Sequence, residues 1–177
     1  MKENLSQLLE SIYGNPIQIK SFEAIGGGCI NETQALKLSN GERVFLKSNP
    51  SAPKNFFTAE ADGLRLLERS KNGPSVPRPL GISTESNPQF LLLEYIESSS
   101  PKVGFASRFG QALAEMHRET QEQYGLDYDN FIGKTVQKNN LELDGLVFFR
   151  EHRIRFQQEL ARKGRGLPKS IDKRLDL

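Results

Sequence analysis

The sequence predicts an α+β fold: an antiparallel five-stranded sheet with one helix, followed by further helices. Two patterns carry this prediction. Apolar and polar residues alternate in three short segments, two further strand-like segments follow, and a helical stripe of apolar residues lies between the third and fourth of the five. A chain of 177 residues is long enough to bury one sizeable core, or a small domain with part of another.

The first three predicted strands cover residues 17–25, 33–39 and 42–48. Each alternates apolar and polar side chains, which is typical of a strand with one buried face. Asn40 and Gly41 form a strong hairpin signal between the second and third strands. A short amphipathic helix over residues 5–13 precedes them.

The predicted helix of this region covers residues 56–70, and its apolar stripe consists of Phe57, Ala61, Leu64 and Leu67. A segment with one glycine and three prolines ends it, because proline cannot continue a helix. Strands over residues 75–83 and 89–97 follow, and the second is apolar enough to be central. The predicted order is therefore β-β-β-α-β-β.

The pattern of apolar residues after residue 104 predicts further helices. One begins near residue 105, with an apolar face formed by Phe105, Phe109, Ala112, Leu113 and Met116. A loop rich in Gly, Asn and Asp is expected over residues 124–140. A last helix is expected from about 144 to 163, with an apolar stripe formed by Leu146, Phe149, Phe156 and Leu160. We expect three parts: an N-terminal lobe at 1–96, a hinge or linker at 97–104, and an incomplete helical lobe at 105–177.

Composition excludes several classes of protein. No segment has the apolar core of a signal peptide or the length of a membrane span, so we expect cytoplasmic residence and no membrane partner. A single cysteine cannot form an internal disulfide, which fits a reducing compartment. The net charge of +2 gives no argument for nucleic acid, and we interpret the basic residues between Arg162 and Arg174 as a solvated tail.

Three consecutive glycines, Gly26, Gly27 and Gly28, lie in the connection between the first two strands, beside Cys29. Such a connection lets the backbone approach a ligand closely, and its N–H groups can face phosphate oxygens. The alternative is an ordinary turn between two strands, and the glycines alone favour that simpler interpretation.

Lys47 and Glu60 favour the interpretation of the glycines as a phosphate-binding loop. Alternation in the third strand sends Val44 to one face and Lys47 to the other, where an ammonium group can reach phosphates held by the Gly-rich connection. At about 100° per residue, Glu60 falls inside the apolar stripe of the helix. A carboxylate there needs a cation, and Lys47 is the obvious one. A surface lysine and a glutamate on a wider polar face are the alternatives.

The order of these elements resembles the small lobe of protein-kinase-like enzymes, in which a strand lysine is oriented by a helix glutamate and touches nucleotide phosphates. Residues 91–97 would then lead into the hinge. Backbone groups of Glu94 and Ile96 would meet the adenine edge, with Leu93 beside the ring. An ordinary buried strand has the same sequence pattern.

Five segments resemble the fructosamine kinase family, also called ketosamine-3-kinases: "GGGCINET", "VFLKSN", "FFTAEADGLRLL", "LLLEYI" and "FGQALAEMHR". The family is related to aminoglycoside and choline kinases. The resemblance runs from about Ile17 to about Gly166. It implies ATP-dependent phosphorylation of the sugar 3-hydroxyl of ketosamines such as ribulosamine and fructosamine adducts, and hence deglycation of small amines or proteins.

The resemblance also implies which residues bind the nucleotide. Residues from Gly26 to Asn31, including Ile30, would cover the phosphates. Lys47 and Glu60 would form the ion pair, and the segment of Glu94, Tyr95 and Ile96 would hold adenine. The implied cofactors are ATP and Mg²⁺.

The chain departs from the family at one point. Kinases of this group take the catalytic Asp from a His-Gly-Asp segment, and a further Asp binds Mg²⁺. Neither of the two histidines here is followed by Gly-Asp. We therefore expect the catalytic Asp and the metal ligands downstream of residue 177, and no catalytic or metal-binding residue in this chain. A non-catalytic ATP-binding or regulatory fragment is the alternative.

Three further expectations follow. The apolar stripes of the last two helices lack covering elements, which favours homo-oligomers through exposed helices or through Cys29. The Cys29 thiol is a candidate for reversible oxidation that would distort the phosphate loop, or a small side chain that merely fits there. Arg153 lies in the last apolar stripe, where it would pair with a carboxylate or meet an anionic substrate group.

Overall fold

The computed structural model describes residues 2–26, 30–164, 166, 168, 171 and 172. The chain divides into two compact units, Met1–Glu119 and Thr120–Leu177. The first unit holds the sheet and three helices of the described chain, and the second holds a small hairpin and a helical segment. The predicted lobe and linker boundaries at 96 and 105 stay a prediction.

The first unit contains the antiparallel five-stranded sheet that the sequence predicts, in the order β1-β2-β3-β5-β4. Its strands are β1 (Ile19–Ala24), β2 (Glu32–Leu38), β3 (Arg43–Asn49), β4 (Pro79–Ser83) and β5 (Gln89–Glu94). The helix α2 (Phe56–Glu68) lies between β3 and β4 in the chain, so the predicted order of elements is confirmed. The strand β5 lies between β3 and β4 and is central, as its apolar sequence indicates.

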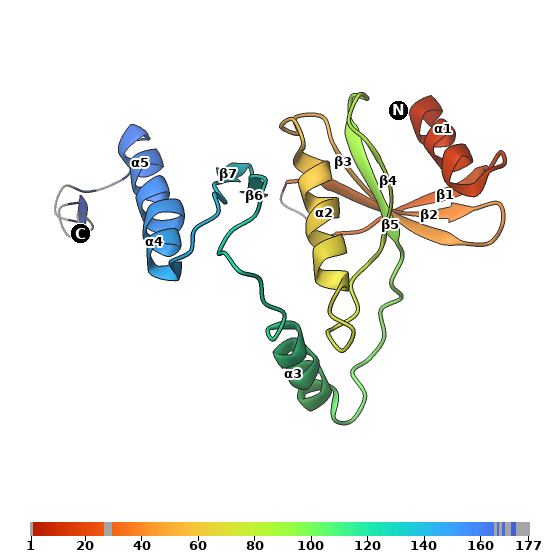
Figure 1. Ribbon diagram of the computed structural model, residues 1–177. Coiled ribbons are helices and arrows are strands. Elements are labelled where there is room, and N and C mark those ends of the chain that lie inside the picture. Colours follow the sequence, from red (N-terminus) through yellow and green to blue (C-terminus); the bar gives the residue numbers. More distant parts are fainter. Residues whose placement is uncertain (1, 27–29, 165, 167, 169–170, 173–177) are drawn as a thin grey trace. The chain divides into compact units, whose positions relative to one another are not determined.

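Two helices lie on opposite sides of this sheet (Figure 1). The helix α1 (Lys2–Tyr13) buries Leu5 and Leu9 completely against one face, where they meet a cluster of side chains from three strands: Leu36, Leu38, Val44, Leu46, Phe90 and Leu92. Burying one leucine in this way contributes about 1.5–3 kcal/mol. The helix α2 contacts β4 and β5 on the other face.

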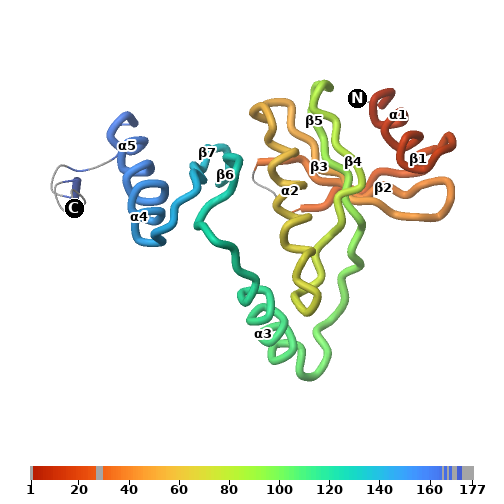
Figure 2. The backbone as a smooth tube through the Cα atoms, in the orientation of Figure 1, coloured from red at the N-terminus to blue at the C-terminus, as the bar shows by residue number. Residues whose placement is uncertain are grey.

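The trace in Figure 2 runs from β3 over a short turn directly into α2. Lys47 on β3 and Glu60 on α2 therefore belong to consecutive elements. The predicted stripe of α2 is only partly right: Phe57 and Ala61 are fully buried, whereas Leu67 at the far end is exposed. Phe56 and Ala59 are buried in addition. The buried residues of α2 therefore lie in its first turns.

The helix α3 (Phe105–Met116) begins after an extended segment and has no buried residue. Phe105 and Phe109 are 51% and 47% exposed, and their rings stack with centroids 5.9 Å apart. The predicted apolar face is therefore exposed at Phe105 and Phe109, whereas Ala112, Leu113 and Met116 are partly buried.

The second unit differs from the prediction in one respect. The segment expected as a loop contains a short hairpin of β6 (Asn130–Ile132) and β7 (Thr135–Gln137). Gly133 turns the chain between them with a φ of 62°. Two apolar-polar alternations of three residues are too short to stand out in a sequence window, which explains why the pattern did not predict them.

The predicted last helix is present as one continuous helical segment of α4 (Gly145–Phe149), the π-helical η1 (Arg150–Arg155) and α5 (Phe156–Lys163). Asp144 caps its start by accepting hydrogen bonds from the amides of Leu146 and Val147. Leu146 and Phe149, which belong to the predicted apolar stripe, are 83% and 58% exposed. No described helix is long and apolar enough to cross a membrane.

Candidate functional site

The ion pair predicted between Lys47 and Glu60 is confirmed: the Nζ of Lys47 contacts Oε1 of Glu60. Lys47 lies opposite Thr33 of β2 and Leu91 of β5 in the sheet register. Its side chain is 22% exposed and that of Glu60 is 28% exposed. The pair is therefore partly open to water, at a place where the ammonium group can also meet an anion.

The sheet register explains why Lys47 faces α2. Val44 and Leu46 belong to the core cluster under α1, so Phe45 and Lys47 point to the opposite face. Phe45 pairs with Ala35 on one side and with Leu93 on the other. An apolar patch thus continues along this face from Lys47 toward the end of β5.

The Gly-rich connection is described at its two ends. Gly27, Gly28 and Cys29 lie outside the described residues, so the expectations for them stay predictions. Ile25 is held at the first end, because the hydroxyl of Thr33 donates to its carbonyl at 2.5 Å and its amide donates to the carbonyl of Thr33 at 2.9 Å. A Cβ added at Gly26 would meet no heavy atom within 4 Å, so the packing of the described chain does not require glycine there.

Asn49 holds the second end, and sequence reasoning missed this residue. Its side-chain amide donates to the carbonyl of Ile30 at 3.3 Å and to Oδ1 of Asn31 at 3.0 Å, and its Oδ1 accepts from the amide of Ser51. Asn49 is only 3% exposed, so these hydrogen bonds satisfy a buried amide. The signal was its position two residues after Lys47, which places both side chains on the same face of β3.

The segment after β5 changes from buried to exposed within four residues. Leu93 is 4% exposed, whereas Ile96 is 55% exposed. The amide of Glu94 donates to the carbonyl of Arg78 at 2.9 Å. The N–H of Glu94 is thus already hydrogen-bonded within the chain, so it is not free to donate to a ligand.

Arg153 lies in the second unit. Its expected pairing with a carboxylate is not found among the described residues, and its expected contact with an anionic substrate group stays a prediction. Its guanidinium donates to the carbonyl of Lys138 and, at 2.7 Å, to Oδ1 of Asn139, and it lies 4.5 Å from the centre of the Phe148 ring. Burial lowers the pKa of Arg153. A further acceptor is the carbonyl of His152 at 3.2 Å, so the acceptors are backbone carbonyls and the side-chain oxygen of Asn139, which is 2% exposed.

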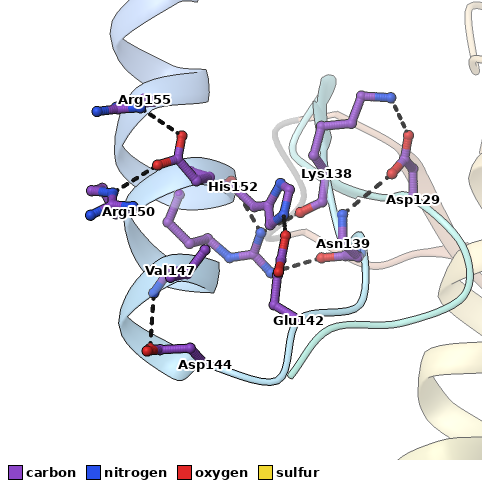
Figure 3. A network of polar contacts seen from close by, with 11 residues as sticks. Asp129, Lys138, Asn139, Glu142, Asp144, Val147, Arg150, His152 and Arg155 are labelled. Atoms are coloured by element: carbon purple, nitrogen blue, oxygen red, sulfur yellow. Dashed lines mark hydrogen bonds and ion pairs between the residues drawn. The ribbon is translucent and has the colours of Figure 1, made fainter. Parts of the chain in front are cut away.

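Figure 3 shows the polar network around this point. The side chain of Lys138 contacts Asp129, the amide of Asn139 donates to Asp129, and His152 lies 3.3 Å from Glu142. These contacts connect the segment after β7 to the π-helical turn. The described groups of this network hydrogen-bond or pair with one another.

A hollow of about 440 Å³ lies in the second unit beside this network. Its lining combines acidic, aromatic and aliphatic side chains: Leu126, Asp127, Tyr128, Asp129, Asn140 and Leu141. In the part of the chain that the structure describes, no group of three or more His, Cys, Asp or Glu side chains is arranged to hold a metal ion.

Comparison with known proteins identifies the family. The sequence model of the fructosamine kinase family matches residues 1–175. The chain belongs to the fructosamine kinase family. The resemblance that the motifs indicate is thus confirmed over nearly the whole sequence.

Individual relatives support the assignment to the fructosamine kinase family. The chain is 35% identical over 163 residues to the protein-ribulosamine 3-kinase, chloroplastic, of Oryza sativa subsp. indica, an alignment that covers 90% of this chain and 47% of the relative. It is 32% identical over 165 residues to a Synechocystis protein assigned as a ketoamine kinase. That alignment covers 93% of this chain and 55% of the relative. The chain thus spans about half the length of these relatives.

Solved structures agree on the fold. A crystal structure from Haemophilus somnus 129PT, assigned as a fructosamine-3-kinase, superimposes with a TM-score of 0.82 at 32% identity, covering 93% of this chain and 55% of that one. A second crystal structure, from Thermobifida fusca and with the same assignment, superimposes with a TM-score of 0.81 at 26% identity. That alignment covers 96% of this chain and 57% of the other. The kinase-like α+β fold predicted from the sequence is therefore confirmed.

Proposed function

We propose that this chain is the nucleotide-binding part of an ATP-dependent kinase that phosphorylates the sugar 3-hydroxyl of ketosamines, such as ribulosamine and fructosamine adducts of small amines or proteins. Membership of the fructosamine kinase family supports this proposal, as does a relative named protein-ribulosamine 3-kinase. Product instability would release the amine, so the role would be deglycation.

The observation that carries the proposal is the ion pair of Lys47 and Glu60. Glu60 orients the ammonium group of Lys47, which then donates to phosphate oxygens of the nucleotide. Asn49 holds Ile30 and Asn31, so the second end of the Gly-rich connection is tied to the same strand as Lys47. The open space at Gly26 leaves room for phosphate to approach the backbone.

The adenine contact is proposed for the segment of Leu93, Glu94, Tyr95 and Ile96. Since the amide of Glu94 already donates to Arg78, the contact uses the carbonyl of Glu94 and the backbone of Ile96. Phe45, which is partly exposed, offers an apolar surface for the flat ring on the face that carries Lys47, beside its buried register partner Leu93.

ATP supplies the phosphoryl group, and Mg²⁺ supplies charge neutralisation at its phosphates. We assign neither the transfer step nor the metal to residues of this chain, because the 177 residues contain no His-Gly-Asp segment. That same observation favours a second candidate function, a nucleotide-binding or regulatory role without transfer.

Two measurements test the proposal. Calorimetric titration with ATP is expected to show binding by the wild-type chain, and Lys47→Met is expected to weaken it at least tenfold, or about 1.4 kcal/mol. The matched control is Lys71→Met, which removes an exposed lysine from the loop after α2. Equal affinity of wild type and Lys47→Met would contradict the assignment of Lys47.

An ATP-coupled assay with ribulosamine and fructosamine substrates separates the two candidate functions. It is applied to this chain and to any longer reading frame that contains it. Turnover supports the kinase. ATP binding without turnover in both proteins supports the non-catalytic alternative.

We also propose that the chain self-associates through exposed apolar helix faces. Phe105 and Phe109 of α3 form one such face, and Leu146 and Phe149 form another. Exposed apolar surface of this kind favours association.

A further inference from the structure

Arg43, at the start of β3, connects three separate segments of the first unit. Its Nη1 lies 2.8 Å from Oε1 of Glu97, and its Nη2 lies 3.2 Å from Oε2 of Glu23 on β1. Its Cζ lies 3.9 Å from the centre of the Tyr95 ring. One guanidinium therefore joins β1 and β3 to the segment that follows β5.

These contacts require the shape of an arginine. The planar fork donates in two fixed directions while its face stacks on an aromatic ring, and a lysine ammonium has neither a planar face nor a rigid fork. Desolvation lowers the pKa of Arg43, but the hydrogen bond and charge of Glu97, with Tyr95 and Glu23, outweigh it and raise the pKa. The arrangement thus favours the charged form.

The solvent exposure of Arg43, Glu23 and Glu97 limits how much their ion pairs can stabilise the fold. The side chains of Glu23 and Glu97 are 72% and 69% exposed, and that of Arg43 is 31% exposed. Ion pairs this open to water add little to global stability. Their effect is to restrict the conformations of the segment they hold.

The two contacts on the segment after β5 lie on either side of Ile96. Tyr95 stacks on Arg43, and Glu97 accepts from it. One residue earlier, the amide of Glu94 is held by Arg78. The backbone of Ile96 is therefore held on both sides, although its own side chain is exposed.

We propose that Arg43 is a positioning residue for nucleotide binding: it holds Tyr95 and Glu97 so that the backbone of Ile96 is presented to adenine. This inference rests on the proposed function of the segment as the adenine contact. Arg43 touches no reacting atom, and it acts through the two residues that flank Ile96.

Hydrogen exchange of the chain without nucleotide tests the positioning directly. Arg43→Gln and Arg43→Lys are expected to speed exchange of the Glu94 amide, which donates to the carbonyl of Arg78, by about three- to tenfold, because the held segment opens more often. Arg65→Gln is the matched control, since Arg65 forms an exposed pair with Asp62 on α2. Unchanged exchange in both Arg43 variants would overturn the inference.

Affinity measurements test the consequence for the nucleotide. Both Arg43 variants are expected to weaken ATP binding roughly three- to tenfold and to leave inorganic tripolyphosphate within about twofold, because only ATP carries adenine. Lys47→Met is expected to weaken both ligands. Equal weakening of ATP and tripolyphosphate in the Arg43 variants would show an effect of charge and would overturn the inference.

A variant on the other side of the contact distinguishes positioning from damage to the fold. Glu97→Gln is expected to reproduce the selective loss for ATP, and the double variant with Arg43→Gln is expected to lose little more. Additive losses contradict the shared contact. If the wild-type chain binds neither ligand, the proposed function fails, while the exchange experiment still decides whether Arg43 holds the segment.

Discussion

The ammonium group of Lys47 and the carboxylate of Glu60 form an ion pair between β3 and α2, with both side chains about a quarter exposed. An ion pair in this position is open enough to exchange partners. It is also sheltered enough to be stronger than a fully exposed one.

We predict a coupling energy of about 1 kcal/mol between these residues, from urea unfolding of Lys47→Met, Glu60→Gln and the double variant. Each single variant leaves one partly buried charge without its partner, and the double variant leaves none. The exposed pair of Asp62 and Arg65 provides the control cycle, with a smaller coupling expected. Equal coupling in the two cycles would show that Lys47 and Glu60 gain nothing from their location.

Arg153 is predicted to stabilise the second unit through Asn139. Arg153→Met leaves the buried Oδ1 of Asn139 without its donor at 2.7 Å, which costs about 1–3 kcal/mol. Arg150→Gln serves as the control, because Arg150 pairs with the neighbouring Glu151 and its side chain is 48% exposed. Proteolysis within residues 120–164 should increase in Arg153→Met alone. Resistance equal to that of wild type would refute this role.

Gly125 is predicted to tolerate no side chain. Its φ is +115°, and an added Cβ would lie 2.5 Å from the carbonyl oxygen of Asn139 and 2.7 Å from that of Asn140. Gly125→Ala should therefore destabilise the second unit by at least about 2 kcal/mol in thermal or urea unfolding.

Gly63, in the middle of α2, provides the opposite case. An added Cβ would meet nothing within 4 Å, so Gly63→Ala should stabilise the helix by about 0.5–1 kcal/mol. Destabilisation by both substitutions would contradict the explanation from local geometry.

Tyr13 is predicted to make stability depend on alkaline pH. Desolvation, followed by the hydrogen bond and charge of Glu42, raises its pKa from 10.0 to about 12. A raised pKa means that the folded state holds the proton more tightly. The contribution is fully present below pH 10 and is lost as the pH rises from about 10 to about 12.

Comparison with Tyr13→Phe measures this contribution. Because the Tyr13 hydroxyl is near the surface, the expected loss is only about 1 kcal/mol over that range. Tyrosinate absorbance follows the titration itself. A difference between the two proteins that stays constant with pH would count against the shifted pKa.

Self-association is predicted to rise with protein concentration and to weaken in a Phe105→Ser, Phe109→Ser double variant, because the two stacked rings form the exposed face of α3. Light scattering at increasing concentration measures it. Arg118→Gln, which breaks an exposed ion pair just after the same helix, is the control. A monomer at every concentration would dispose of the proposal.

The sequence by itself determined the α+β class, the order of strands and helix in the first unit, and the pairing of Lys47 with Glu60. Strand alternation and helical stripes report which face of an element is buried, and both features depend on neighbouring residues in the chain. The family motifs were also readable, because they are local strings. The adenine-binding role of residues 93–96 stays a prediction, because a buried strand has the same sequence pattern with or without a ligand.

Only the tertiary structure decided the roles of Arg43, Asn49 and Arg153. Each makes its decisive contacts with residues distant in the chain: Arg43 with Glu97, Asn49 with the end of the Gly-rich connection, and Arg153 with Asn139. Helical position placed Arg153 in an apolar stripe but did not show its partner, since hydrogen-bond partners depend on the packing of separate elements. Periodicity states which way a side chain points, and only the fold states what lies there.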